Sequence, residues 1–212
     1  MFSKIFTIAK GNKTLIAWDC PKDQRSSYVQ NNLGNSIEQI GFVNEYSIPA
    51  FEMMGGEFSL NGTLAYSSTL KPSSEFLASG LSSKVLRISE AETAIRLELP
   101  FKQIDNVVLF EGIGYILLED DEEVATQLLS GYCNKYSLPA FGALIYKDGV
   151  MYPNVYVHKT DSLISETACG SGSVAISILK SLSEVKQPSG GIIYINKNNS
   201  IFTITAEVSE IY

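Results

Sequence analysis

Cysteine, histidine and tryptophan are scarce in this chain, and their scarcity narrows the possible chemistry. The 212 residues include three cysteines, one histidine and one tryptophan. Cys20, Cys133 and Cys169 do not have the spacing of metal ligands, and three thiols cannot all pair in disulfides. We therefore expect no metal site and a reducing, cytoplasmic compartment.

Basic clusters and long apolar runs are also lacking. The formal net charge of −7 argues against nucleic acid or an anionic membrane as the main partner. No apolar run approaches the length of a membrane span, and the N-terminal residues do not form the apolar region of a signal peptide. The chain is 45% hydrophobic and 18% charged, which is typical of a globular protein with a substantial core.

A glycine-rich turn around Cys169 is the most informative stretch. Residues 166–175 read Glu-Thr-Ala-Cys-Gly-Ser-Gly-Ser-Val-Ala and lead into an apolar run that ends at Leu179. Such a turn predicts a helix N-terminus, where free N–H groups and the helix dipole attract an anion. The same field favours a thiolate over a thiol. The alternative is an ordinary buried cysteine beside a glycine-containing helix start.

This turn has a counterpart earlier in the chain. Residues 59–65, Ser-Leu-Asn-Gly-Thr-Leu-Ala, align with residues 169–175 at an offset of 110, and residues 46–51 match residues 136–141 at five of six positions. The pattern predicts an α+β fold of two similar halves, 1–103 and 104–212, each with one central helix. If the halves face each other, both helix N-termini point at one anion, for which a carboxylate is suited.

The remaining pattern predicts several local elements. We expect a loop over residues 21–35 and a helix over 36–45 capped by Ser36, because a small polar residue precedes that segment. The acidic run 119–123 is expected to begin a second helix that ends near Asn134. Strands and hairpins are predicted at 2–8 with 14–19, 85–89 with 94–99, 113–118, and 192–196 with 201–206, with an added hairpin within 142–165.

These motifs resemble the diaminopimelate epimerase-like superfamily. Residues 166–173 match the motif of its second cysteine, residues 54–63 (Met-Gly-Gly-Glu-Phe-Ser-Leu-Asn-Gly-Thr) resemble the motif of its first, and Lys10-Gly11-Asn12 resembles its N-terminal Gly-Asn. The Gly-Gly-Glu-Phe segment is closer to the histidine racemase branch. The resemblance implies two pseudo-symmetric halves, each a curled sheet or small barrel around a central helix.

The resemblance also implies an activity and a set of site residues. Members of the superfamily are cofactor-independent racemases and epimerases, in which two cysteines exchange protons with opposite faces of the amino-acid Cα. Cys169 and Ser59 occupy the two catalytic positions, and Asn12 orients the substrate. The backbone of Leu60, Asn61, Gly62, Gly170 and Ser171 forms the carboxylate cradle. An amino acid is the expected small-molecule partner, and a homodimer is left open.

Two departures from the family pattern affect this interpretation. Ser59 stands where the family has cysteine, and an alcohol is a far weaker acid than a thiol. A natural serine is compatible with one-base isomerase or dehydratase chemistry or with an inactive amino-acid-binding protein; an introduced serine is the other explanation. Thr160 and Asp161 replace the Glu-Arg pair of diaminopimelate epimerase, so that diaminopimelate lacks its arginine partner. We expect Asp161 to meet a cationic or imidazole side chain instead.

Overall fold

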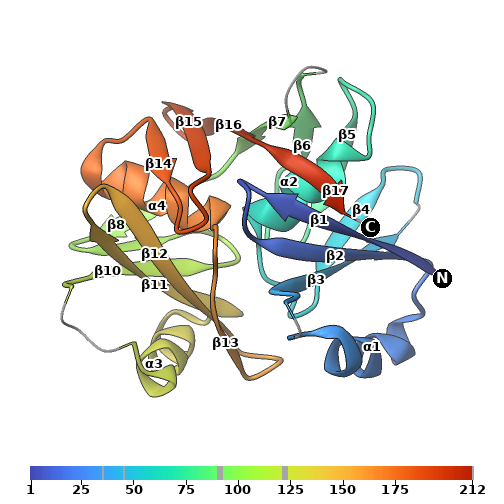
Figure 1. Ribbon diagram of the computed structural model, residues 1–212, viewed down its shortest axis with the longest axis horizontal. Helices are drawn as coiled ribbons and strands as arrows, with labels where there is room; N and C mark the ends of the chain where they lie inside the picture. The colour runs from blue at the N-terminus through green and yellow to red at the C-terminus, as the bar shows by residue number, and fades with distance from the viewer. Residues whose placement is uncertain (35, 45, 90–92, 121–123, 212) are drawn as a thin grey trace.

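The computed structural model describes residues 1–34, 36–44, 46–89, 93–120 and 124–211. Two sets of strands curl around two central helices and join into one 17-stranded sheet, which confirms the predicted α+β class (Figure 1). The central helices are α2 (Leu60–Ser68) and α4 (Gly170–Lys180), whose first eight residues are all buried. In the described part of the chain, no helix has the length and apolar character needed to cross a membrane.

The first set of strands surrounds α2. Its opening pair forms the predicted antiparallel hairpin, and its closing pair confirms the predicted hairpin near residues 85–99, although turn residues 90–92 lie outside the described residues. The set consists of β1 (Phe2–Ile8), β2 (Lys13–Trp18), β3 (Gln39–Asn44), β4 (Ala50–Met53), β5 (Glu75–Ala78), β6 (Val85–Arg87) and β7 (Thr93–Glu98), with the 3-10 helix η1 (Lys22–Gln24) and α1 (Arg25–Asn32) after β2.

The second set surrounds α4 and repeats the order of the first. Its closing hairpin, β15 with β16, is also as predicted, and β13 is the added strand within residues 142–165. The set consists of β9 (Val107–Leu109), β10 (Gly114–Leu118), β11 (Ala140–Lys147), β12 (Val150–Val157), β13 (Ser162–Ser165), β14 (Glu184–Lys186), β15 (Ile192–Asn198) and β16 (Ile201–Ala206), with α3 (Thr126–Tyr136) after β10. In Figure 1, α1 and α3 lie at the lower edge of the two sets.

The strand pairings show that the two sets have the same topology. β2 runs parallel to β3, β3 is antiparallel to β4, and β4 is parallel to β5. In the second set, β10 runs parallel to β11, β11 is antiparallel to β12, and β12 is parallel to β14. The two parallel connections contain α1 and α3, as parallel pairing requires a crossover of this kind.

Each set also contains one strand that follows the other set in the sequence. β8 (Lys102–Ile104) follows β7 and pairs with β9, whereas β17 (Val208–Ile211) follows β16 and pairs with β1. β7 and β16 pair with each other and connect the two sets. The predicted division at residue 103 falls within β8, and the pairing of β17 shows that the two sheets are interleaved.

Two local predictions in the first half are wrong. Residues 36–45 do not form a helix, because Gln39–Asn44 is strand β3, and residues 25–32 form α1 instead of a loop. The strand is buried at five consecutive positions, so that it lacks the alternation that identifies a half-exposed strand. Ser36 has a left-handed φ of 79° and caps no helix.

Two further expectations need correction. The matching segments 46–51 and 136–141 lead into β4 and β11, but the topological counterpart of β11 is β3, so the match does not join equivalent strands. The second helix begins at Thr126, after the acidic run, and has no acidic residue in its first turn. Residues 121–123 of that run lie outside the described residues.

One large hydrophobic core includes residues from both sets and from both central helices. α2 packs on β1, β2, β3, β4, β7 and β17, and α4 packs on β9, β10, β11, β12, β14 and β15. A smaller cluster, which includes Leu129, Cys133 and Phe141, lies where α3 packs on β11 and β12. The large core therefore holds α2 and α4 in fixed positions relative to each other.

Candidate active site

Ser59 and Cys169 are the N-cap residues of the two central helices, as the duplicated turn predicts. Both have extended backbone angles, and each side chain accepts a hydrogen bond from an N–H group three residues later. The distance is 3.2 Å from Gly62 N to Ser59 Oγ and 3.3 Å from Gly172 N to Cys169 Sγ. The serine and the cysteine therefore occupy equivalent positions in the two sets.

The two helix N-termini are linked directly by reciprocal hydrogen bonds. Leu60 N donates to Ser171 Oγ at 3.0 Å, and Gly170 N donates to Asn61 Oδ1 at 2.9 Å. Since the N–H of Gly62 donates to Ser59, the N–H groups of Leu60, Gly62 and Gly170 all have partners within the protein. These three N–H groups of the predicted cradle are therefore not available to a ligand.

Two N–H groups of that cradle remain available. Within the described part of the chain, no hydrogen-bond partner is found for the N–H of Asn61 or the N–H of Ser171. They are the second residues of α2 and α4, so that each lies where the helix dipole is positive. An anion that accepts from both therefore bridges the two sets.

Ser59 and Cys169 both line a narrow cavity, in which about 20 Å³ is open to a water molecule. Apolar side chains form much of its wall, and the described residues that line it include three glutamates but no Lys, Arg or His. The glutamates are Glu38, Glu57 and Glu166. A ligand that enters this cavity therefore meets negative or neutral side chains, together with the positive ends of two helices.

The surroundings of Cys169 favour the neutral thiol. Its side chain is buried, and Tyr115 Oη lies 3.5 Å from Sγ. Burial and the adjacent Glu166 raise the pKa of Cys169 well above its ordinary value, although hydrogen bonds from Tyr115 and Gly172 oppose this shift. The expectation that the helix field favours the thiolate is therefore wrong, because desolvation has the larger effect.

Ser59 has no base as a hydrogen-bond partner. Its hydroxyl donates to Gln39 Oε1 at 2.7 Å, and the Gln39 amide donates in turn to Asn12 Oδ1 and Thr14 Oγ1. A serine hydroxyl needs an adjacent base to lose its proton near neutral pH. The neutral amide of Gln39 does not provide one, so Ser59 is held as an alcohol.

Asn12 is fully buried and does not line the cavity, although it was expected to orient the substrate. Its Nδ2 donates to Glu38 Oε2 at 3.0 Å and to Glu166 Oε1 at 3.4 Å. Its Oδ1 accepts from Thr14 and Gln39. Asn12 therefore positions side chains that do line the cavity, and it acts on a ligand only through them.

Glu38 is surrounded by hydrogen-bond donors. Oε1 accepts from Thr167 Oγ1 at 2.6 Å, and Oε2 accepts from Thr167 N at 3.1 Å as well as from Asn12. Burial raises the pKa of Glu38, and these hydrogen bonds oppose the shift. The carboxyl connects β3 of the first set to the turn before Cys169 in the second.

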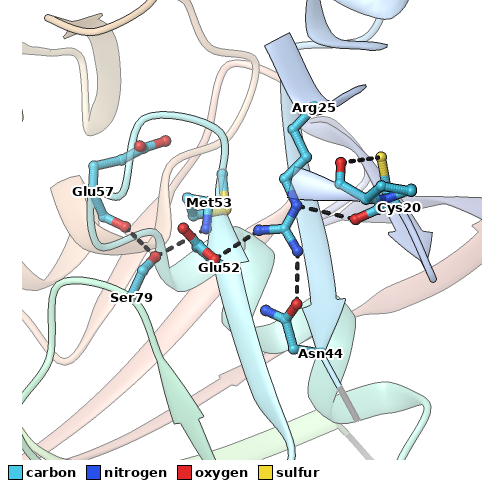
Figure 2. A network of polar contacts seen from close by, with 8 residues as sticks. Cys20, Arg25, Asn44, Glu52, Met53, Glu57 and Ser79 are labelled. Atoms are coloured by element: carbon cyan, nitrogen blue, oxygen red, sulfur yellow. Dashed lines mark hydrogen bonds and ion pairs between the residues drawn. The ribbon is translucent and has the colours of Figure 1, made fainter. Parts of the chain in front are cut away.

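Glu57 is fixed by the segment that leads to Ser59. Its Oε2 accepts from Gly55 N at 2.8 Å, and its main-chain oxygen accepts from Ser79 Oγ at 2.7 Å. Figure 2 shows this contact beside the network of Arg25, whose guanidinium pairs with Glu52 and donates to Asn44. Burial raises the pKa of the Glu57 carboxyl to about 7, although hydrogen bonds and the charge of Lys159 oppose the shift.

Glu166 differs from the other two carboxyls because one of its oxygens is unsatisfied. Oε1 is held by Asn12, whereas Oε2 is buried and has no hydrogen-bond partner among the described residues. Burial, with the charges of Glu38 and Glu57, raises the pKa of Glu166 to about 8, although a contact with Cys169 lowers it. Cys169 lies close to Glu166 but does not form a hydrogen bond with Oε2.

Asp161 lies outside the cavity. It is exposed in the turn between β12 and β13, where it has a left-handed φ of 48°. Its carboxylate accepts a hydrogen bond from Tyr156 Oη at 2.9 Å. The structure thus brings Ser59, Cys169, Asn61 and Ser171 together but leaves Asp161 at a separate surface turn.

Four residues of the site were not predicted from the sequence, namely Glu38, Gln39, Tyr115 and Gln187. Gln39 was hidden within the expected helix at 36–45, and Tyr115 lies in a strand whose apolar run showed no sign of a role. Gln187 Oε1 accepts from Cys169 N at 2.9 Å and so fixes the backbone of the turn. Only Gln39 carries a signal in the sequence, because a polar residue at the start of a buried strand needs a hydrogen-bond partner.

Comparison with known proteins agrees with this fold. No protein-family model matches the chain. It is 28% identical to a histidine racemase from Fusobacterium nucleatum subsp. nucleatum over 235 aligned residues, which cover 92% of this chain and 87% of the relative. A predicted epimerase from Pseudomonas aeruginosa has a similar structure, with a TM-score of 0.68 at 8% identity, and the match covers 99% of this chain and 96% of that one.

A phenazine biosynthesis protein of the PhzF family from Bacillus anthracis also has this fold, with a TM-score of 0.59 at 11% identity and coverage of 99% and 98%. The chain has the fold of these epimerase-like and PhzF proteins, and its likeness to the histidine racemases supports an assignment to the same superfamily. The named relatives support an isomerase-type function for the family, of the racemase or epimerase kind.

Proposed function

We propose that this chain is a cofactor-independent amino-acid racemase or epimerase, similar to the histidine racemases, which acts by proton transfer at two sides of Cα. The observation that carries the proposal is the pair of equivalent N-cap side chains, Ser59 and Cys169, which line one cavity. A carbon atom held between two such positions can lose a proton to one and gain a proton from the other.

The carboxylate of the amino acid binds the N–H groups of Asn61 and Ser171. Both dipoles then stabilise it, and they also stabilise the negative charge that builds up when Cα loses its proton. The apolar wall, which includes Phe58, Ile113 and Val155, excludes water and strengthens these interactions. Cys169 is placed to transfer a proton at one face of the carbon.

Ser59 makes the two faces unequal. Its hydroxyl donates to a neutral amide and has no base to activate it, so Cys169 is the only thiol available for proton transfer among the residues that line the cavity. We expect the chain with Ser59 to exchange the Cα proton slowly and the variant with a second thiol to invert the centre. The same hydrogen bond favours a second candidate function, a one-base isomerase or dehydratase that uses Cys169 alone.

The cavity favours a substrate with a basic side chain. Three carboxyls and no basic side chain are found among the described residues that line it, so a cationic ligand group supplies the missing charge. The Fusobacterium relative is named for histidine, which has such a group. Glu57, inside the cavity, is the carboxyl we assign to that side chain in place of Asp161.

The experiment is Cα-proton exchange in D₂O, followed by proton NMR, for Ser59→Cys and the chain with Ser59. L-Histidine, D-histidine and a panel of other amino acids serve as substrates. We expect Ser59→Cys to exchange and interconvert both histidine enantiomers, at a rate at least ~100-fold above that of the Ser59 chain, because proton transfer by a suited group contributes this much. The matched control, Cys169→Ala in the Ser59→Cys background, should lose both reactions.

Three results would contradict the proposal. A folded Ser59→Cys variant that exchanges the Cα proton of no amino acid overturns it. Loss of water or a shifted double bond in the product identifies the one-base isomerase or dehydratase instead. Stabilisation of both variants by amino acids, without turnover by either, identifies a binding protein.

A further inference from the structure

Glu166 has a buried oxygen that the protein itself does not satisfy. Its Oε1 is held 3.4 Å from Asn12 Nδ2, while Oε2 has no partner in the described part of the chain, and the side chain is 9% exposed. Buried carboxyl oxygens are almost always hydrogen-bonded, because an unsatisfied one loses its interactions with water. A ligand donor that reaches Oε2 removes this cost.

Glu166 lies beside the carboxylate cradle. It is three residues before Cys169 in sequence, lines the same cavity, and is close enough to Cys169 for each group to shift the pKa of the other. In an α-amino acid the ammonium nitrogen and the carboxylate carbon are both bonded to Cα. A carboxylate held by Asn61 and Ser171 therefore places the ammonium group near Cα and within the same cavity.

The other two carboxyls are less suited to an ammonium group at Cα. Glu38 already accepts two hydrogen bonds from Thr167 and one from Asn12. Glu57 accepts from Gly55, and the charge of Lys159 partly balances it. Only Glu166, among these three, combines an unpartnered buried oxygen with a position next to Cys169.

We propose that Glu166 Oε2 binds the α-ammonium group of the substrate, while the N–H groups of Asn61 and Ser171 bind its α-carboxylate. This assignment rests on the proposed function, since it takes an α-amino acid as the ligand. It makes Glu166 the residue that distinguishes an amino acid from a carboxylic acid of the same shape.

Binding through Glu166 also changes the charge beside the thiol. The titratable groups that face Glu166 are Glu38, Glu57 and Cys169, and Tyr115 lies beside Cys169. In these surroundings Glu166 holds a proton near neutral pH, because burial raises its pKa to about 8. Pairing with an ammonium group requires the carboxylate, so ligand binding releases that proton, and the paired carboxylate no longer opposes the thiolate of Cys169.

The test compares ligands with and without the amino group by isothermal titration calorimetry near pH 7. The probes are L-histidine and imidazole-4-propionate, which lacks only the amino group. The proteins are wild type, Glu166→Gln and the control Glu184→Gln, which changes an exposed residue of β14. Wild type should bind L-histidine ~10- to 100-fold more tightly than imidazole-4-propionate, because the free energy of a hydrogen bond between charged groups corresponds to this ratio of affinities. Glu166→Gln should lose most of that preference, and Glu184→Gln should keep it.

Titrations in buffers of different ionisation enthalpy count the protons released. Wild type should release close to one proton more than Glu166→Gln on binding L-histidine. An unchanged preference for the amino group in Glu166→Gln overturns this inference alone. If that variant does not fold, equal proton release by wild type on binding L-histidine and imidazole-4-propionate overturns it as well, because the two ligands differ only in the amino group. A wild-type chain that binds no amino acid overturns the inference together with the proposed function.

Discussion

Replacing Glu166 by glutamine should change how the stability of the protein depends on pH. Burial raises the pKa of this carboxyl from 4.5 to about 8, so the folded chain keeps a proton that the unfolded chain loses at lower pH. Between these values the unfolded state is stabilised by ionisation while the folded state is not. The free energy of unfolding of the wild type therefore falls as the pH rises from about 5 to about 8.

The size of the effect follows from the pKa difference. Each pKa unit corresponds to about 1.4 kcal/mol. Summed from pH 5 to pH 8, the difference in proton binding between the folded and unfolded states lowers the free energy of unfolding by about 3 kcal/mol for Glu166. Glutamine has nearly the same shape and does not ionise, so the variant lacks this decline. Glu57 remains in both proteins, and its contribution cancels in the comparison to first order.

Urea unfolding followed by the fluorescence of Trp18 measures this difference at about pH 5 and about pH 8. We expect the stability of Glu166→Gln, relative to wild type, to increase by roughly 3 kcal/mol from the lower pH to the higher. Glu184→Gln, at an exposed position of β14, is the control and should follow the wild type. If Glu166→Gln loses as much stability as wild type over this interval, the buried-acid reasoning is refuted.

Asn61→Ala should destabilise the protein by about 2 to 4 kcal/mol in urea unfolding, because it removes hydrogen bonds to Ala168 and Gly170 and leaves buried groups unpaired. A loss below 1 kcal/mol would show that these bonds do not hold the two helix N-termini together. Tyr115→Phe should slow the alkylation of Cys169 by iodoacetamide several-fold near pH 9, measured by peptide mass spectrometry, because the Tyr115 hydroxyl stabilises the thiolate. Faster alkylation in this variant would contradict the assigned hydrogen bond.

The sequence predicts that Ser59 and Cys169 stand at the starts of two helices, because the signals for a helix start are local. Ser59 and Cys169 each precede a glycine-containing helix start, and an N-cap side chain interacts with N–H groups only two or three residues away. The closing hairpins are also local, since each joins neighbouring strands through a short turn. These features depend little on the rest of the chain.

Features that depend on distant contacts could not be predicted in the same way. β3 is buried between β2 and β4, and its apolar residues read equally well as a helix, which concealed Gln39 and Glu38. Asp161 is eight residues from Cys169 in sequence, but it lies in the turn between β12 and β13, outside the cavity. The neutral state of Cys169 reflects burial by both strand sets, which no single motif records.

The exchange of strands between the two sets has a consequence during synthesis. β1 begins at Phe2, but its outer partner β17 begins at Val208, so this edge cannot be covered until a ribosome has made all of the chain between the two strands. Until then β1 presents unpaired N–H and C=O groups, which readily pair with other chains. The nascent N-terminal half is therefore a candidate client for chaperones, and its safe maturation depends on the rate at which the last strand emerges.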